Sequence, residues 1–271
     1  MMKLKQSLSP GIWEVLIFMI IASTAPVING GEIYVPQIST GISGSNAGQL
    51  LSLIQLDYVY YQFFVTVITM AVFVLKVIVF DFGWNLEGGV ETSYLLLPVK
   101  RSRLLLPIIF SGVVLPYWVA SASVFYALAL VHFHLNLYSA LTVALLDFLP
   151  LLLVCSISML VAMKTKSTVS TLGVAIALFF FLGIFLGLNI DIAYRMHSPA
   201  PLLLLGILFP AASMYDYFTF GSFIPGWFGI ISTPGRFLSV FPWLVAGSVI
   251  LNILLLAAVF WYWGHRFQIS G

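Results

Sequence analysis

The residues in this chain that could do chemistry are few and scattered. Asp147 stands alone in a long apolar run, three residues before Pro150. A carboxylate inside a membrane helix is a functional candidate, although a structural hydrogen bond at a proline kink accounts for it equally well. His132 and His134 have a spacing that directs their side chains to different faces of a helix. With four histidines and the lone Cys155, the sequence predicts no metal site.

The sequence also lacks the patterns of known enzyme sites. It contains no H-E-x-x-H and no G-x-S-x-G, and its carboxylates fall at different expected depths. It has no G-x-x-x-x-G-K-[ST] loop, which is the usual phosphate cradle. Any ATP that the protein uses must therefore be bound by another chain, and we expect neither catalysis nor a cofactor in this one.

The composition indicates a membrane protein. The chain has 271 residues, of which 61% are hydrophobic and only 7% charged, against about 25% charged in ordinary soluble domains. So few charges cannot cover the surface of a water-soluble protein of this size. This excludes a soluble enzyme and a disordered chain, and the net charge of +2 predicts no nucleic-acid partner.

Apolar stretches predict the membrane spans, since a helix crosses the hydrocarbon core with about 20 apolar residues. These stretches are apolar all round, as contact with lipid requires. We expect an all-α polytopic integral membrane protein forming one transmembrane domain over residues 1–271. Six stretches qualify, at about 12–28, 51–80, 104–131, 138–163, 169–188 and 243–264.

The positions of lysine and arginine predict the orientation, because cytoplasmic loops are enriched in both. Eight of the eleven fall on one side of the six spans, and only Arg195 and Arg236 fall on the other. Lys76 lies near the inner end of the second span. We expect a location in the cell membrane with both termini cytoplasmic. The N-terminal segment also resembles a cleavable signal peptide, but Glu14 within its apolar run favours a retained helix.

Two long segments are expected on the outer side. Residues 29–49 are rich in Gly, Ser and Asn, whereas residues 189–242 are apolar and aromatic with interrupting prolines and glycines. The second segment predicts a re-entrant or interfacial helical hairpin. An outer gate and a cap resting on the membrane fit this pattern equally well.

The longest inner segment, residues 81–103, is the most informative. Acidic residues and glycines come first, and a short helix is expected from Glu91, whose charge suits the positive end of a helix. Pro98 ends that helix, and a basic cluster follows. Such a segment suits the docking of a cytoplasmic partner, although composition alone also fits an interfacial connector.

Both this segment and the expected topology resemble type-2 ABC exporter permeases. Glu87 and Gly89 stand at the acidic and glycine positions of that family. Lys100 occupies a position where serine is frequent, and Val90 stands where threonine is usual. Residues 158–167 resemble the end of the family's fourth span. Further matching positions are Leu95, Leu96, Leu97, Pro98, Val99, Arg101 and Phe209-Pro210-Ala211.

The resemblance implies a permease subunit that pairs with a second copy or a paralogue. Two cytoplasmic ABC ATPase subunits, which bind ATP and Mg²⁺, would dock on the inner face and switch the transport path from inward-open to outward-open. The apolar and aromatic composition of the chain suits a hydrophobic or amphipathic substrate, although the family also exports glycans. The implied coupling residues are Glu87, Gly89, Glu91, Pro98, Val99, Lys100 and Arg101.

Two further groups of residues are candidates for function. Asp57, Tyr58, Tyr61 and Gln62 could line the transport path near the outer end of the second span, or lie in the aromatic belt at the interface. The pattern Gly183-x-x-x-Gly187 allows close helix approach. It could form the contact between two permeases or a contact within one bundle.

Two other functions remain open at this level. One is the membrane anchor of a respiratory or electron-transfer complex, for which haem would require histidines that face each other within spans. The other is a carrier that needs no ATPase, although carriers usually contain repeats and broken helices, and this chain has no clear repeat.

Overall fold

A computed structural model describes residues 11–39, 61–62, 65–74, 76, 102–131, 137–178, 207–208, 210 and 234–265. The regular structure in this part of the chain is all helical. Residues 61–62, 65–74 and 76 are helical and are called the span-two segment below. A shorter apolar helix covers Thr168–Leu178. The named elements are α2 (Gly11–Ser39), α6 (Ser102–Ile109), η2 (Phe110–Val114), α7 (Leu115–Val131), α8 (Leu137–Thr165) and α12 (Pro234–His265).

Four helices are long and apolar enough to cross a membrane. Their apolar windows are Gly11–Ile28, Leu105–Leu130, Ala140–Thr165 and Pro242–His265. These windows coincide closely with the first, third, fourth and sixth expected spans. The second and fifth expected spans are described only in part, so the count of six spans stays a prediction.

Helix α2 and helix α12 are longer than the apolar stretches that predict them. α2 continues past Ile28 to Ser39, and α12 begins at Pro234, so both enter segments expected as outer loops. Hydropathy marks only the part of a helix inside hydrocarbon, whereas backbone hydrogen bonds continue the helix beyond it. Of the expected outer hairpin, residues 207, 208 and 210 are described; Ile207 lies against Gly247 of α12, where an added Cβ would be 3.6 Å from Ile207 Cγ1.

The third expected span is one continuous helix with a π turn inside it. Pro107 in α6 has no amide hydrogen. In η2 the amide of Leu115 donates to the carbonyl of Phe110, five residues earlier in the chain, whereas an α-helical amide donates to the carbonyl four residues earlier. The Ser111 hydroxyl donates to the Pro107 carbonyl at 2.6 Å. This span therefore contains a local break in the regular helical hydrogen bonding.

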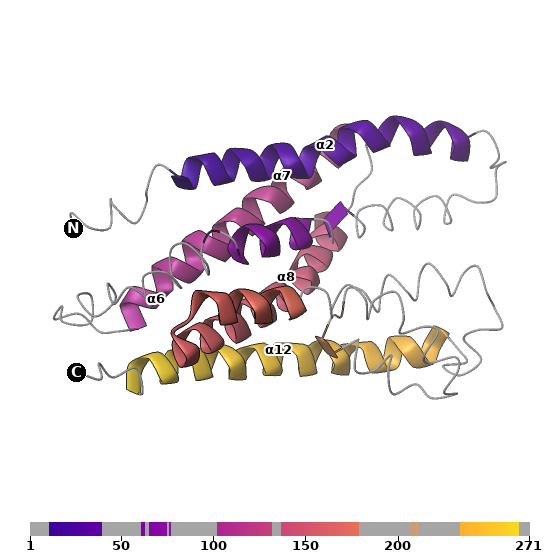
Figure 1. Ribbon diagram of the computed structural model, residues 1–271. Helices are drawn as coiled ribbons and strands as arrows, with labels where there is room; N and C mark the ends of the chain where they lie inside the picture. Colours follow the sequence, from indigo (N-terminus) through magenta and orange to yellow (C-terminus); the bar gives the residue numbers. More distant parts are fainter. Residues whose placement is uncertain are drawn as a thin grey trace.

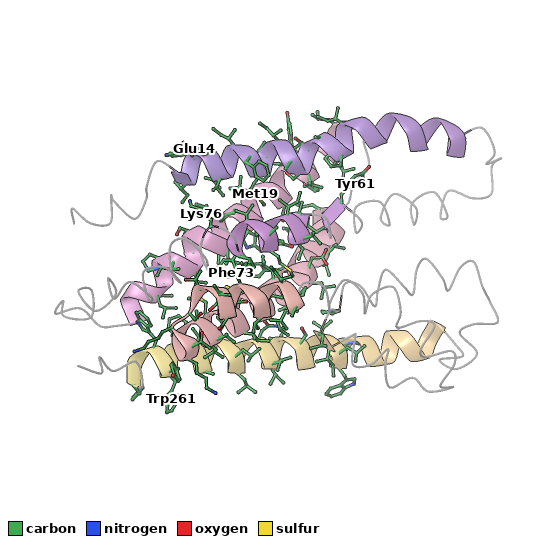
Figure 2. All side chains as sticks on the ribbon, in the orientation of Figure 1. Glu14, Met19, Tyr61, Phe73, Lys76 and Trp261 are labelled. Carbon is green, nitrogen blue, oxygen red and sulfur yellow. The ribbon has the colours of Figure 1, made fainter. Side chains whose placement is uncertain are left out.

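The helices pack in two main pairs (Figure 1). α2 lies along α7, and α8 lies along α12. The start of α2, the start of α6 and the end of α12 lie at the same end of the bundle. Figure 2 places Glu14 and Lys76 toward this end and Tyr61 toward the opposite end.

Polarity is inverted relative to a water-soluble protein. Large apolar side chains cover the outward faces of α2 and α12, among them Ile17, Ile21, Ile253 and Leu254. The interior holds many of the polar side chains, as expected where lipid surrounds the helices. The buried polar side chains in the described part are Ser23, Gln62, Thr66, Thr69, Ser121, Asp147, Ser156, Ser158, Thr171, Ser248 and Asn252.

A capped turn joins α8 to the helix Thr168–Leu178. Lys166 has a φ of 51°, which is the left-handed conformation common just after a helix end. The Ser167 hydroxyl accepts a hydrogen bond from the Ser170 amide at 3.4 Å, so Ser167 caps the next helix. Lys164 and Lys166 are both exposed at this turn.

We predict that Trp263 is a main packing residue of α12. Its side chain is 0% exposed, whereas Trp261 on the same helix is 52% exposed. Trp263→Ala should leave a cavity and cost about 3–5 kcal/mol, which would lower the melting temperature of the purified protein in detergent. Trp261→Ala is the matched control and should change it much less. Equal losses in the two variants would contradict this packing.

Candidate functional site

A cluster of polar side chains lies where the span-two segment, α7 and α8 meet. Gln62, Thr66 and Asp147 are each 0% exposed. Tyr117 and Ser121 come from α7, one helical turn apart, and both are buried. A shared face of α7 therefore presents two hydroxyl groups to its neighbours.

The amide of Gln62 joins the span-two segment to α7. Its Nε2 donates to the Tyr117 hydroxyl and to the Ser121 Oγ, both at 2.7 Å. These two bonds use both hydrogens of the amide nitrogen. The pairs are 55 and 59 residues apart in the chain, so they fix the register of two separate helices.

Two hydroxyl groups connect the cluster to the backbone of α8. The Tyr117 hydroxyl donates to the Ala144 carbonyl at 2.6 Å. The Thr66 hydroxyl lies 3.2 Å from the Gln62 carbonyl and 3.3 Å from the Asp147 carbonyl. Both α8 acceptors lie within the two turns that precede Pro150, where the proline removes one amide donor from the helix.

Aromatic rings cover one side of the cluster. The rings of Tyr117 and Phe148 are 5.0 Å apart between centroids, and Trp118 packs edge-on against Tyr117 at 5.6 Å. Trp118 and Phe148 also touch, at 6.0 Å. These rings place an apolar wall beside the polar groups, which strengthens the electrostatic interactions within the cluster.

The carboxyl group of Asp147 differs from the rest of the cluster. Neither of its oxygens has a hydrogen-bond partner in the described part of the chain, although the residue is fully buried. The hydrogen bond expected for this carboxyl group near the proline is not found among the described residues; the Thr66 hydroxyl donates instead to the Asp147 backbone carbonyl, at 3.3 Å. The carboxyl group is electrostatically close to the Tyr117 hydroxyl. An acid group in this position is costly unless it binds something or is neutral.

A second group of buried polar atoms lies along α8 and α12. Asn252 Nδ2 donates to the Ser248 carbonyl at 2.9 Å, while Asn252 Oδ1 and the Ser248 hydroxyl lack partners within the described part. The hydroxyls of Ser156 and Ser158 on α8 also lack partners there. The serines of α8 and the Ser248–Asn252 pair of α12 therefore lie on two helices that pack together.

The structure places only some of the sequence-predicted residues. Gln62 is in the polar cluster, and Tyr61 is half-buried against the core. Asp57, Tyr58, Gly183 and Gly187 lie outside the described residues, as do the coupling candidates Glu87, Gly89, Glu91, Pro98, Val99, Lys100 and Arg101. Their roles stay predictions.

Sequence reasoning singled out Asp147 and Gln62 but not Thr66, Tyr117 or Ser121. The available signal is weak, because hydroxyl residues are common in membrane helices and only their spatial pairing makes a cluster. Among the described residues, no group of three or more His, Cys, Asp and Glu side chains could hold a metal ion. The cluster can hold helices together, and its carboxyl group can exchange a proton.

Comparisons with protein-family models, with characterised proteins and with solved structures found no match for this chain.

We predict that the Tyr117 hydroxyl contributes measurably to stability. Tyr117→Phe leaves the Ala144 carbonyl and one amide hydrogen of Gln62 without their partner. Interhelical hydrogen bonds in membranes are worth about 0.6 kcal/mol on average and up to about 1.7, so the variant should melt slightly but clearly below the wild type. Tyr126→Phe, on a residue that is 66% exposed on the same helix, is the control and should melt like the wild type.

A double-mutant cycle with Gln62→Leu tests whether the two side chains act together. The double variant should lose less stability than the sum of the single variants, because each single change already breaks the same hydrogen bond. Simple additivity would show that the Gln62–Tyr117 bond contributes nothing.

Proposed function

We propose that this chain is the membrane-spanning permease subunit of an ATP-driven exporter in the cell membrane. ATP hydrolysis takes place in a separate cytoplasmic ATPase subunit that docks on residues 87–101. A second permease copy or paralogue completes the transport path, with Gly183 and Gly187 at the contact. The substrate is a hydrophobic or amphipathic molecule.

The observation that carries this proposal is the order of residues before α6. An acidic and glycine-containing stretch, three leucines and a Pro-Val-Lys-Arg turn follow one another, as in type-2 ABC exporter permeases. α6 begins at Ser102, directly after Arg101. A force applied to the docking segment would therefore pass straight into a membrane-spanning helix.

The arrangement of the described helices supports the same proposal. α2 starts and α12 ends at the end of the bundle where α6 starts, as expected for an even number of spans with both termini cytoplasmic. The exposed Lys164 lies in the last turn of α8 and the exposed Lys166 follows this helix; both belong to the basic residues that the proposed topology places on the cytoplasmic side.

The bundle also contains suitable parts for a change between two packings. Pro107 in α6 and the π turn that follows it interrupt the regular hydrogen bonding of the third span. The first turns of this span, in α6, can therefore tilt relative to α7 at low cost. α7 then continues to Tyr117 and Ser121, which bond to two neighbouring elements. ATP binding in the partner would stabilise one of the two arrangements.

Asp147 favours one second candidate, a carrier that works without an ATPase. Ion-coupled carriers depend on carboxyl groups inside their membrane helices, and the Asp147 carboxyl is buried without a hydrogen-bond partner in the described part. The presence or absence of an ATPase subunit separates the two candidates.

The first test is gentle extraction of the tagged protein from its native membrane. We expect mass spectrometry to identify an ATPase with a phosphate-binding loop, at about one copy per permease. Co-purifying redox subunits with a haem absorption band would contradict the proposal and indicate an anchor subunit. The absence of any partner would also contradict it and would favour the carrier.

We further predict that Glu87 and Arg101 couple ATP hydrolysis to transport. Glu87→Ala and Arg101→Ala should leave the protein folded and the ATPase active but abolish ATP-driven movement of fluorescent lipids or hydrophobic dyes in proteoliposomes. Lys164→Ala changes an exposed charge at the end of α8 and serves as the control. Normal coupled transport in both variants would remove the argument for a docking segment.

A further inference from the structure

We propose that the carboxyl group of Asp147 is a proton-binding site inside the membrane region, and that its proton is released when the span-two segment and α7 separate from α8. The inference concerns the chain itself and does not require an ATPase partner.

The hydrogen-bond donors of the cluster are all used elsewhere, which supports a neutral carboxyl group at Asp147. Both amide hydrogens of Gln62 go to α7, the Tyr117 hydroxyl donates to Ala144, and the Thr66 hydroxyl is shared between two backbone carbonyls. These donors therefore leave the carboxyl oxygens without a hydrogen bond, as observed. An ionised carboxylate without donors is far more costly to bury than a neutral acid.

Among the described residues, no charged side chain compensates a carboxylate at Asp147. On α7, the residues that could titrate are the buried Tyr117 and the exposed Tyr126. On α12 these are Tyr262, which is half-buried, and His265, which is exposed. The span-two segment has Tyr61 and the half-buried Lys76, and α8 itself has the buried Cys155 and, in its last turn, the exposed Lys164. No ion pair to Asp147 occurs among these described groups.

The available space limits the ligand to a proton. An exposed fraction of 0% means that no water-sized sphere fits beside Asp147. A metal ion or an organic cation would need more room and more oxygen ligands than this. A proton adds to one carboxyl oxygen without any change in packing, which converts COO⁻ to COOH.

Proton release and helix separation are coupled through the same donors. A carboxylate at Asp147 would draw the hydroxyl of Tyr117 or Thr66 away from the α8 backbone, or would require water to enter. Either change weakens the bonds that join α7 and the span-two segment to α8. The released proton passes to the water that enters, so the reaction needs no other reactant.

The consequence is a defined pH dependence of stability. The packed bundle binds one more proton than the unfolded chain at neutral pH, so stability falls as the pH rises. For a single site the unfolding constant increases by at most about tenfold per pH unit.

The test uses the full-length protein in detergent and in lipid nanodiscs. Infrared spectra of the wild type at neutral pH should contain the carbonyl band of a protonated carboxyl group that shifts in heavy water. The band should be missing from Asp147→Asn, which keeps the shape of the neutral acid.

Thermal unfolding gives the second test. From about pH 5 to about pH 9 the melting temperature of the wild type should decline, and that of Asp147→Asn should change less. Ser158→Ala, which alters another buried polar residue of α8, is the control and should keep the wild-type decline.

Several outcomes would overturn the proposal. One is a wild-type spectrum in which no protonated band depends on Asp147; another is an unchanged pH profile in Asp147→Asn. If Asp147→Asn fails to fold, Asp147→Glu replaces it, and a protonated-carboxyl band that is unchanged in frequency in Asp147→Glu comes from another residue and overturns the proposal. The last is a melting temperature that rises with sodium concentration at constant pH, when choline replaces sodium to keep the ionic strength constant. That result would identify a metal cation as the ligand.

Discussion

The hydroxyl of Tyr117 joins the span-two segment, α7 and α8 at one point. It accepts a hydrogen bond from Gln62 and donates one to the carbonyl of Ala144. Between helices in lipid there is no hydrophobic driving force, because the tails are as apolar as leucine side chains. Packing and polar contacts therefore decide how the helices fit together. The Tyr117 contacts determine the relative register of the span-two segment, α7 and α8.

The inverted polarity of the bundle follows from the same constraint. The apolar outer faces of α2 and α12 suit lipid, while serine, threonine and amide groups turn inward. Most members of the cluster around Tyr117 have hydrogen-bond partners there. The Asp147 carboxyl has none among the described residues, which distinguishes the cluster from a purely structural network. Pro107, the π turn and Pro150 lie on the two helices that contribute most to the cluster, so the strongest polar contacts lie close to the weakest parts of the backbone.

Much of the fold could be predicted from the sequence, and less of the site. Long apolar runs give the positions of α2, α7, α8 and α12 because span length depends only on local hydropathy. The extension of α2 to Ser39 and the early start of α12 were missed, since hydropathy is silent outside the hydrocarbon. Asp147 is visible as a rare charge in an apolar run. Thr66, Tyr117 and Ser121 are ordinary residues for a membrane helix, and their association is visible only in three dimensions.

The sequence by itself determined that the chain consists largely of helices apolar enough to cross a membrane, because only 7% of its 271 residues are charged. It also contains the succession of residue types at 87–101 on which the proposed ATPase docking depends. Only the tertiary structure decided which polar residues meet. Gln62 and Ser121 are 59 residues apart, and no local pattern specifies a contact at that separation. The same holds for the isolation of the Asp147 carboxyl, since whether a buried group has a partner depends on every helix around it.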